Sequence, residues 1–447
     1  MKKNKLEKLI ENPPLLLGIS FITIILIGTL LLNLPLASKS GESVGVINAF
    51  FTATSATCVT GLIVVNTAMY WSTFGKIVII SLIQIGGLGT MVIFTMIAIL
   101  LRKKIGLKQR LLIKEQLNYD SLKGLVRLVK SVVLISFLIE LTGAILLSFK
   151  LIPMFGLKKG IGFSLFHSIS AFCNAGFDLF GNSLESYYFD TFLNLIIMSL
   201  VIMGGLGFTV YLDIYKKRHW KNFNLHTKLV IITTIILLLV GTILFLLIEN
   251  WNPDTIGNMS FKNKLLVASF QSTIVRTAGF NSIPTAQLRD ATIFLLTILM
   301  FIGGSPASTA GGIKTTTFGV LLFSTISTLK GEKEAVVLKK TIPVYTILKA
   351  LAITFICMLL VILVAFGVQV IEKEQFDFID VLFETVSAFA TVGITRGITA
   401  DLSDLSKIIL ALTMFLGRIG PTTLAVAILR KKKISNIKYS EGNIIVG

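Results

Sequence analysis

A short pattern that ends in glycine recurs four times along the chain and constrains its fold more than any other feature. The copies run from Phe51 to Gly61, Phe166 to Gly176, Ser269 to Gly279 and Phe383 to Gly393. Their terminal glycines are 115, 103 and 114 residues apart. A hydroxyl stands six positions before each glycine, on Ser55, Ser170, Thr273 and Ser387. This spacing predicts four tandem copies of one structural unit.

A second landmark follows each copy in register. It consists of two adjacent residues, Gly86-Gly87, Gly204-Gly205, Gly303-Gly304 and Gly417-Arg418. The landmark begins 25, 28, 24 and 24 residues beyond the respective glycine, and only the last copy replaces its second glycine. Two landmarks that keep the same order four times strengthen the prediction of an internal repeat.

The composition places the repeated unit in a membrane. Of the 447 residues, 54% are hydrophobic and 15% are charged, whereas about 25% of the residues of an ordinary soluble domain are charged. Hydrophobic runs of spanning length occur twice per repeat and bracket each glycine pattern. These eight runs cover roughly 14–35, 76–101, 125–152, 190–215, 227–249, 289–327, 344–371 and 405–429.

We therefore expect an all-α polytopic membrane protein. Four tandem helix–pore hairpin–helix repeats would surround one pore with pseudo-fourfold symmetry. The expected repeats are 1–101, 102–215, 216–327 and 328–447. A basic cytoplasmic connection opens the second repeat, an intramembrane loop interrupts the third, and a basic cytoplasmic tail closes the fourth.

The basic residues predict the orientation of the chain in the membrane. Five segments hold 28 of the 42 Lys and Arg residues, namely 1–14, 102–130, 216–228, 330–349 and 430–447. The four intervening segments, 36–76, 150–190, 250–290 and 372–407, hold 12. By the positive-inside rule, both termini are cytoplasmic and the four hairpins enter the membrane from outside.

A hairpin that descends as a half helix and returns extended leaves backbone carbonyls without helical partners. These groups are too costly to expose to lipid, so they must face a water-filled cavity. Four such hairpins around one axis form a ring of carbonyls that can replace the hydration shell of a cation. Glycine suits this ring because inward-turned carbonyls require dihedral angles that a Cβ atom penalises. Ordinary kinked core segments are the alternative explanation.

The chain resembles the Trk/Ktr/HKT superfamily of potassium transporters. The similarity is carried by T-C-V-T-G-L, C-N-A-G-F, R-T-A-G-F and A-T-V-G-I at the ends of the four patterns, and by the fourfold plan of the whole chain. Eight spans point to the Ktr-type membrane subunits. The resemblance implies K⁺ as the permeant ion, Na⁺ as a possible activator and the filter as the only metal site. The filter residues carried over are Cys58, Val59, Thr60, Gly61, Cys173, Asn174, Ala175, Gly176, Thr277, Ala278, Gly279, Thr391, Val392 and Gly393.

The resemblance also implies partners and a location. It predicts a homodimer in the lipid bilayer of a bacterial cell membrane. It also predicts control by a separate cytoplasmic nucleotide-binding ring protein (KtrA-like). The chain itself contains no nucleotide-binding motif, which agrees with a separate regulator.

The third inner span contains a predicted loop at mid-membrane depth. Four glycines and a proline within ten residues cannot hold a regular helix there, and the family has an intramembrane gate at this place. The predicted gate comprises Gly303, Gly304, Ser305, Pro306, Ala307, Ser308, Thr309, Ala310, Gly311 and Gly312, together with Lys314 and Arg418. A merely kinked, close-packed helix is the alternative.

Lys314 and Arg418 are the two basic residues that lie outside the nine segments counted above, and both are within spans. A charge at the centre of a spanning helix costs about 2.5–3.5 kcal/mol on insertion scales, so a functional role is the default. Arg418 is expected to face the pore below the carbonyl ring and to donate to the carbonyls of the loop. Lys314 either joins the gate or extends its amine to the cytoplasmic surface.

Several other functions find no support in the sequence. The net charge of +19 does not form the basic stripe of a nucleic-acid-binding protein, because the basic residues punctuate the hydrophobic runs. The three cysteines and three histidines show no metal-ligand spacing. No constellation of catalytic residues predicts an enzyme, and no cofactor is expected. A Na⁺-coupled secondary cation transporter stays an alternative, although repeats that all have the same orientation favour a static pore.

Overall fold

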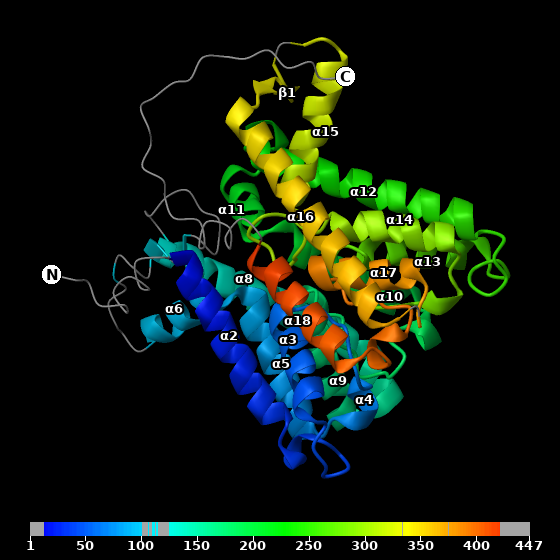
Figure 1. The fold of residues 1–447 in the computed structure, drawn as a ribbon. Coiled ribbons are helices and arrows are strands. Elements are labelled where there is room, and N and C mark those ends of the chain that lie inside the picture. The colour runs from blue at the N-terminus through cyan, green and yellow to red at the C-terminus, as the bar shows by residue number, and fades with distance from the viewer. Residues whose placement is uncertain are drawn as a thin grey trace.

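The computed structural model describes residues 13–100, 106, 110–111, 113–114, 125–332, 334–373 and 375–420. The basic connection before the second repeat and the basic tail lie largely outside these residues. The described part is almost entirely helical, as the sequence predicts (Figure 1). The division into repeats at the stated boundaries stays a prediction.

Each repeat opens with a long outer helix. These helices are α2 (Pro13–Leu32), α8 (Leu125–Phe155), α12 (Leu225–Glu249) and α16 (Val344–Ile371). Within the described part of the chain, they are the four helices that are long and apolar enough to cross a membrane unaided. Large apolar side chains such as Phe137, Ile243 and Phe366 are exposed on them, which suits a surface that faces lipid.

A half helix follows each outer helix and stops just before the repeated glycine. The half helices are α3 (Val46–Cys58), α9 (Leu157–Phe172), α13 (Phe261–Ile274) and α17 (Phe378–Ala390). In the first and fourth repeats the next residue, Val59 or Thr391, adopts the left-handed conformation, which ends an α-helix. The expected descent of each hairpin as a half helix is confirmed.

The first three inner spans differ from the expected continuous helices, because each is broken into two. They comprise α5 (Thr73–Leu88) with α6 (Thr90–Leu100), α10 (Thr191–Leu206) with α11 (Phe208–Lys217), and α14 (Asp290–Phe301) with α15 (Thr315–Leu329). In the fourth repeat α18 (Asp404–Ile419) ends just before Gly420, the last residue that the structure describes. Helices α10 and α11 meet at 89°. Counted by length and composition among the described residues, four helices could span a membrane, or five with the α10–α11 pair taken as one.

The breaks share one cause. Gly89, Gly207 and Gly420 each lie three residues beyond the first landmark glycine and have φ/ψ values of 92°/136°, 91°/139° and 90°/131°. These dihedral angles lie outside the helical region and are accessible chiefly to glycine. In the third repeat Pro306 occupies the equivalent position and lies within a longer break, which runs from Ile302 to Lys314. The sequence analysis predicts only this third break, although Gly89 and Gly207 carry a signal for the first two.

Contacts between repeats close a ring. Within each repeat, the outer helix packs against its own half helix. Each inner helix also packs against the half helix of the next repeat, in the pairs α5–α9, α10–α13, α14–α17 and α18–α3. The last pair joins the fourth repeat to the first. The fold therefore has the pseudo-fourfold arrangement that the sequence predicts.

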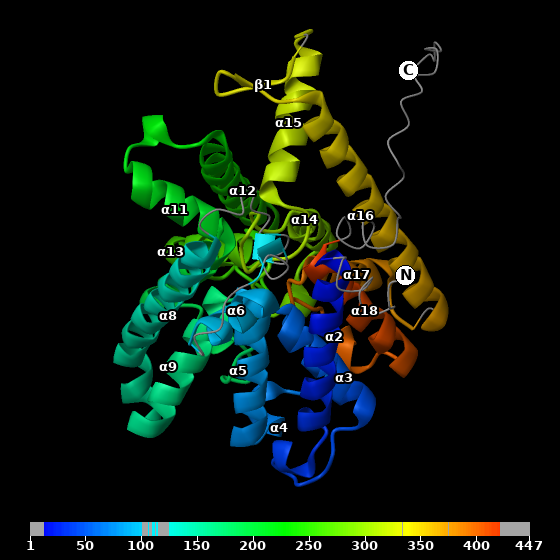
Figure 2. The same cartoon turned by 90° about the vertical axis from the view of Figure 1, so that its left-hand side faces the viewer.

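Short elements connect the spans. These are η1 (Pro35–Ala37), α4 (Thr67–Tyr70), η2 (Glu185–Tyr187), η4 (Thr285–Gln287) and η5 (Ile398–Ala400), and η3 (Trp220–Asn222) links α11 to α12. The antiparallel strands β1 (Val336–Val337) and β2 (Lys340–Thr341) link α15 to α16. Figure 2 shows α15 and α16 projecting beyond the other helices with β1 at their tip.

The first landmark glycine lets each inner helix approach the end of its own half helix. A Cβ atom on Gly86, Gly204 or Gly417 would come under 3.0 Å from the carbonyl oxygen of Thr57, Phe172 or Phe389, respectively. Each of these carbonyls lies four residues before its repeated glycine. The second landmark therefore contacts the residue four positions before the repeated glycine, which explains why the separations are similar.

We expect Gly204→Ala to destabilise the protein because the new methyl group would overlap the backbone at Phe172. Overpacking of this kind costs roughly 1–3 kcal/mol, so the melting temperature in detergent should fall by several degrees. Gly162→Ala on α9 is the matched control, because a Cβ atom there meets nothing within 4 Å. Equal melting temperatures for the two variants would contradict this account of the landmark.

Candidate functional site

The four repeated glycines meet in a closed ring. A Cβ atom on Gly61 would lie 2.5 Å from the carbonyl oxygen of Ala175, and one on Gly176 would lie 2.8 Å from that of Ala278. A Cβ atom on Gly279 would lie 2.5 Å from the carbonyl oxygen of Val392, and one on Gly393 would lie 2.1 Å from that of Thr60. Each glycine thus contacts the residue before the glycine of the next repeat. We call these four glycines and the four residues before them the carbonyl ring.

The φ angle alternates in sign along the backbone of the ring. The glycines have φ values of 95°, 68°, 75° and 92°, and the residues two positions earlier have φ values of 59°, 61°, 74° and 53°. The residue between them has a negative φ in every repeat. Alternating handedness turns successive carbonyls toward the same side of a strand, whereas ordinary strands alternate. Glycine is required by this dihedral angle and by the contact with the next repeat.

The earlier residues hold a conformation that is costly for their type. They are Val59, Asn174, Thr277 and Thr391, and three of them are β-branched. A β-branched residue with positive φ is a genuine outlier. Such strain persists only where the surrounding structure enforces it, and it gathers at functional sites. The same strain in four repeats indicates that the shape of this segment is under functional constraint.

The hydroxyls six residues before the glycines brace the ring in two repeats. Ser55 Oγ accepts a hydrogen bond from the Gly61 N–H at 3.0 Å, and Ser387 Oγ accepts one from the Gly393 N–H at 3.0 Å. Ser170 Oγ instead donates to the Phe177 carbonyl at 2.7 Å, just beyond the ring. The expected brace of the ring is confirmed for Ser55 and Ser387.

The third repeat departs from this pattern. Thr273 Oγ1 donates to the Ser269 carbonyl within its own helix, so it does not brace the ring. The reason is a shift of one residue between the repeats. Ala278 and Ala175 each precede a ring glycine, but the Ala278 N–H bonds the carbonyl four residues before it, on Ile274. The Ala175 N–H bonds the carbonyl five residues before it, on Ser170. The aligned hydroxyl of Thr273 is therefore not the structural equivalent of the three serines.

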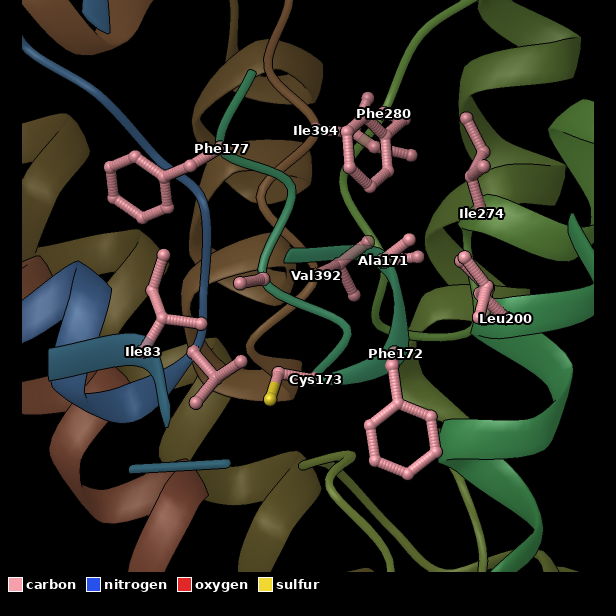
Figure 3. Packing of buried hydrophobic residues seen from close by; sticks show 14 of the residues in the cluster. Ile83, Ala171, Phe172, Cys173, Phe177, Leu200, Ile274, Phe280, Val392 and Ile394 are labelled. Atoms are coloured by element: carbon pink, nitrogen blue, oxygen red, sulfur yellow. The ribbon is translucent and has the colours of Figure 1, made fainter. Parts of the chain in front are cut away.

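Apolar residues directly after the glycines pack behind the ring. They are Leu62, Phe177, Phe280 and Ile394, each at most 1% exposed. Figure 3 shows the last three together with Val392 and Cys173 in the packed core. Dense packing on this side resists movement of the extended segments.

In the second and fourth repeats, the residue nine positions before the glycine bonds the segment that follows the ring. The sequence analysis does not identify these residues. His167 Nε2 accepts a hydrogen bond from the Leu179 N–H at 3.1 Å, and Glu384 Oε1 accepts one from Thr399 Oγ1. Both side chains are almost completely buried. Their shared position in the repeat was the available signal, but their unlike side chains hid it.

The predicted gate residues form a loop below the ring. Residues 302–314 contain no helix, and the segment joins the other repeats through its backbone. The Ser305 N–H bonds the Gly205 carbonyl at 3.0 Å, and the Phe208 N–H bonds the Ala307 carbonyl at 2.8 Å. A Cβ atom on Gly311 would come 2.9 Å from the Ala390 carbonyl. The loop is therefore fixed between the second and fourth repeats.

Arg418 spans the space beneath the ring. Its guanidinium donates to the Thr309 carbonyl of the loop and, at 2.5 and 3.2 Å, to the carbonyls of Gly86 and Gly87. The side chain thus connects three repeats through three backbone carbonyls. This geometry is the predicted contact between Arg418 and the freed carbonyls of the loop.

Lys314 belongs to the same cluster. Its amine donates to the Ala310 carbonyl at 2.7 Å, beside the carbonyl that accepts from Arg418. This contact favours the prediction that Lys314 joins the gate. Two cations hold adjacent carbonyls of the loop, so a loop with few internal helical bonds keeps a defined shape.

Comparisons with known proteins agree with this architecture. Residues 6–440 match the model of the TrkH family, described as cation transport protein. The chain is 44% identical over the full length of both proteins to the Ktr system potassium uptake protein B of Bacillus subtilis. It is 40% identical to the potassium/sodium uptake protein NtpJ of Enterococcus hirae, over 100% of this chain and 99% of the relative.

A solved structure has the same fold. The potassium transporter TrkH from Vibrio parahaemolyticus superposes with a TM-score of 0.72, covering 92% of this chain and 84% of the other. The two sequences are only 21% identical, so this likeness concerns the arrangement of the helices.

We expect Ser387→Ala to loosen the fourth quarter of the ring, because it leaves the buried Gly393 N–H without its acceptor. An unpaired buried donor costs about 1–3 kcal/mol. Hydrogen exchange measured by mass spectrometry should therefore speed up in the peptide that contains Gly393. Thr273→Ala is the control, since its hydroxyl bonds only within its own helix. Equal exchange in Ser387→Ala and the wild type would exclude the brace.

Proposed function

This chain belongs to the TrkH family of cation transport proteins, and we propose that it is the ion-conducting membrane subunit of a potassium uptake system. The family consists of transport proteins, not enzymes, and the chain is a multi-pass membrane protein. The observation that carries the proposal is the carbonyl ring, in which each glycine contacts a carbonyl of the next repeat. The names of the full-length relatives support K⁺ as its ion.

We propose that the ring is the selectivity filter. The filter residues are those predicted from the sequence, in four stretches: Cys58, Val59, Thr60 and Gly61; Cys173, Asn174, Ala175 and Gly176; Thr277, Ala278 and Gly279; and Thr391, Val392 and Gly393. Their carbonyls replace the water of a K⁺ ion. The carbonyl ends of the four half helices below the ring add negative potential.

The driving force for uptake is electrical in this proposal. An inside-negative membrane potential supplies about 2.3 kcal/mol per 100 mV for each charge, so the pore needs no chemical reaction. A Na⁺-coupled secondary transporter is the second candidate. It is favoured by the name of the Enterococcus relative, a potassium/sodium uptake protein. Repeats that share one orientation favour the pore, with Na⁺ as a possible activator.

We propose that residues Gly303 to Gly312 form the gate, held by Lys314 and Arg418. The contacts of Arg418 with Thr309, Gly86 and Gly87 support a fixed positive charge in the path below the ring. A cation that leaves the ring meets this charge and the loop together. Opening requires the loop to lose a few hydrogen bonds, while the ring above it keeps its own braces.

The proposed assembly contains further components. We propose a homodimer in a bacterial cell membrane, with both termini cytoplasmic and a separate nucleotide-binding ring protein (KtrA-like) as regulator. The relatives belong to a Ktr system by name, which supports a system of several proteins. The chain needs no cofactor in this proposal.

Replacing a ring glycine by serine should lower the selectivity for K⁺ over Na⁺. The Cβ atom would meet the carbonyl of the next repeat, and a strained contact of this size corresponds to a loss of roughly tenfold. The measurement is ion flux into proteoliposomes under separate K⁺ and Na⁺ gradients, with Gly61, Gly176, Gly279 and Gly393 each changed. Gly397→Ser is the control, because its φ of 102° is similar but nothing lies within 4 Å of a Cβ atom. Wild-type selectivity in all four ring variants would show that the filter lies elsewhere.

Deleting part of Pro306 to Gly311, or changing Arg418 to Gln, should raise K⁺ flux. Each change removes an obstruction, and about 1.4 kcal/mol less barrier gives about tenfold more flux. Selectivity should stay near that of the wild type, because the ring lies above the loop. The assay is K⁺ flux into proteoliposomes with Na⁺ competition.

Arg289→Gln provides the control for the change of charge. Arg289 lies at the start of α14, donates to the Trp251 carbonyl and does not touch the loop. If the gate variants also lost selectivity for K⁺ over Na⁺, the result would indicate that the loop supports the filter. Unchanged flux in folded protein would favour a static, close-packed segment.

A further inference from the structure

A buried carboxylate lies behind the second quarter of the ring. Glu140 on outer helix α8 is 4% exposed. Its two carboxylate oxygens accept from the Gln84 side-chain amide at 3.0 and 3.1 Å, and the Cys173 thiol lies 3.9 Å from Oε1. Cys173 stands three residues before Gly176, next to the ring. The carboxylate is thus one side chain away from the proposed ion path.

The fold does not require this carboxylate. Outer helix and half helix are joined here by the Glu140 backbone, whose carbonyl accepts from Ser168 Oγ at 2.5 Å. The third repeat makes the same joint with Leu238, whose carbonyl accepts from Ser272 Oγ at 2.8 Å. Leu238 and Glu140 each lie three residues before a glycine that packs on the serine concerned, Gly241 or Gly143. An apolar side chain therefore suffices at this position.

Gln84 is unusual in the same way. It stands two residues before its landmark glycine, where the other repeats have Ile202, Phe301 and Phe415. Two polar residues at positions that are apolar elsewhere meet each other across α5 and α8. They form a pair that neither helix packing nor the repeat explains.

The pair suits an ionised carboxylate that has no protein counter-ion. Both oxygens accept from the same Gln84 nitrogen, so each keeps a further lone pair for another donor or a cation. Among the described residues, no Lys or Arg forms an ion pair with Glu140. A buried charge without a partner is costly within a membrane, so a cation is expected nearby. The neighbouring ion path can supply it.

We propose that Glu140 is the electrostatic counter-charge for the cation held at the ring. Gln84 orients the carboxylate, and Cys173 separates it from the ring. A charge acting at this range attracts every monovalent cation, so it raises ion occupancy without choosing between K⁺ and Na⁺. The inference rests on the proposed function, because it needs a cation in the ring. Within that function, the carbonyls of the ring determine which ion binds, and Glu140 raises the occupancy of the bound ion.

The test is ion binding by calorimetry on the purified full-length protein, titrated with K⁺ and separately with Na⁺. Glu140→Gln should weaken the binding of both ions by the same factor, roughly tenfold. The double variant Glu140→Gln with Gln84→Glu moves the charge across an existing hydrogen bond and should restore binding to within about twofold.

The outcomes separate the two proposals. Absence of K⁺ binding in the wild type would refute the proposed function itself. Binding in the wild type with unchanged affinity in Glu140→Gln would overturn the role of Glu140 alone. A changed ratio of K⁺ to Na⁺ affinity would also overturn it, because that result means that Glu140 positions the filter. If Glu140→Gln does not fold, failure of the double variant to bind near wild-type affinity decides against the proposal.

Discussion

The contact between a repeated glycine and a backbone carbonyl of the next repeat is the constraint on which the structure depends. It is made four times and closes on itself, from Gly393 back to Thr60. No side chain fits between the two backbones, so the half helices must end at fixed points. The inner helices must approach equally closely, through Gly86, Gly204 and Gly417. The carbonyl ring and its scaffold thus follow from one set of backbone distances.

The same constraint explains why the inner spans are broken. Backbone carbonyls that bond another repeat cannot also satisfy a helix, and a bilayer tolerates such groups only along a cavity. Inner helices end beside Gly89, Gly207 and Gly420, whereas residues 302–314 of the third repeat form a longer loop. Arg418 and Lys314 satisfy carbonyls of that loop. The positive charges that are costly in a membrane are therefore placed where freed carbonyls can accept from them.

The asymmetry of the repeats carries as much information as their symmetry. Ser55 and Ser387 bond the ring directly, whereas Thr273 bonds its own helix. Charged or polar groups replace apolar ones at single positions, as with Arg418, Glu140 and Gln84. A strictly fourfold pore has no need for such differences. They are the natural places to seek control of the ion, because the shared framework already provides the fold.

The sequence alone determined the number of repeats, the membrane environment, the half helices and the ring glycines, because each depends on local features: hydrophobic length, spacing and the lack of a Cβ atom. It also indicated the loop of the third repeat, from its glycines and Pro306. Only the tertiary structure decided that Arg418 reaches Thr309, that Thr273 lies out of register and that Glu140 meets Gln84. The two contacts join residues far apart in the chain, and the position of Thr273 depends on a shift of one residue. A pattern along the sequence does not record which side chains face each other.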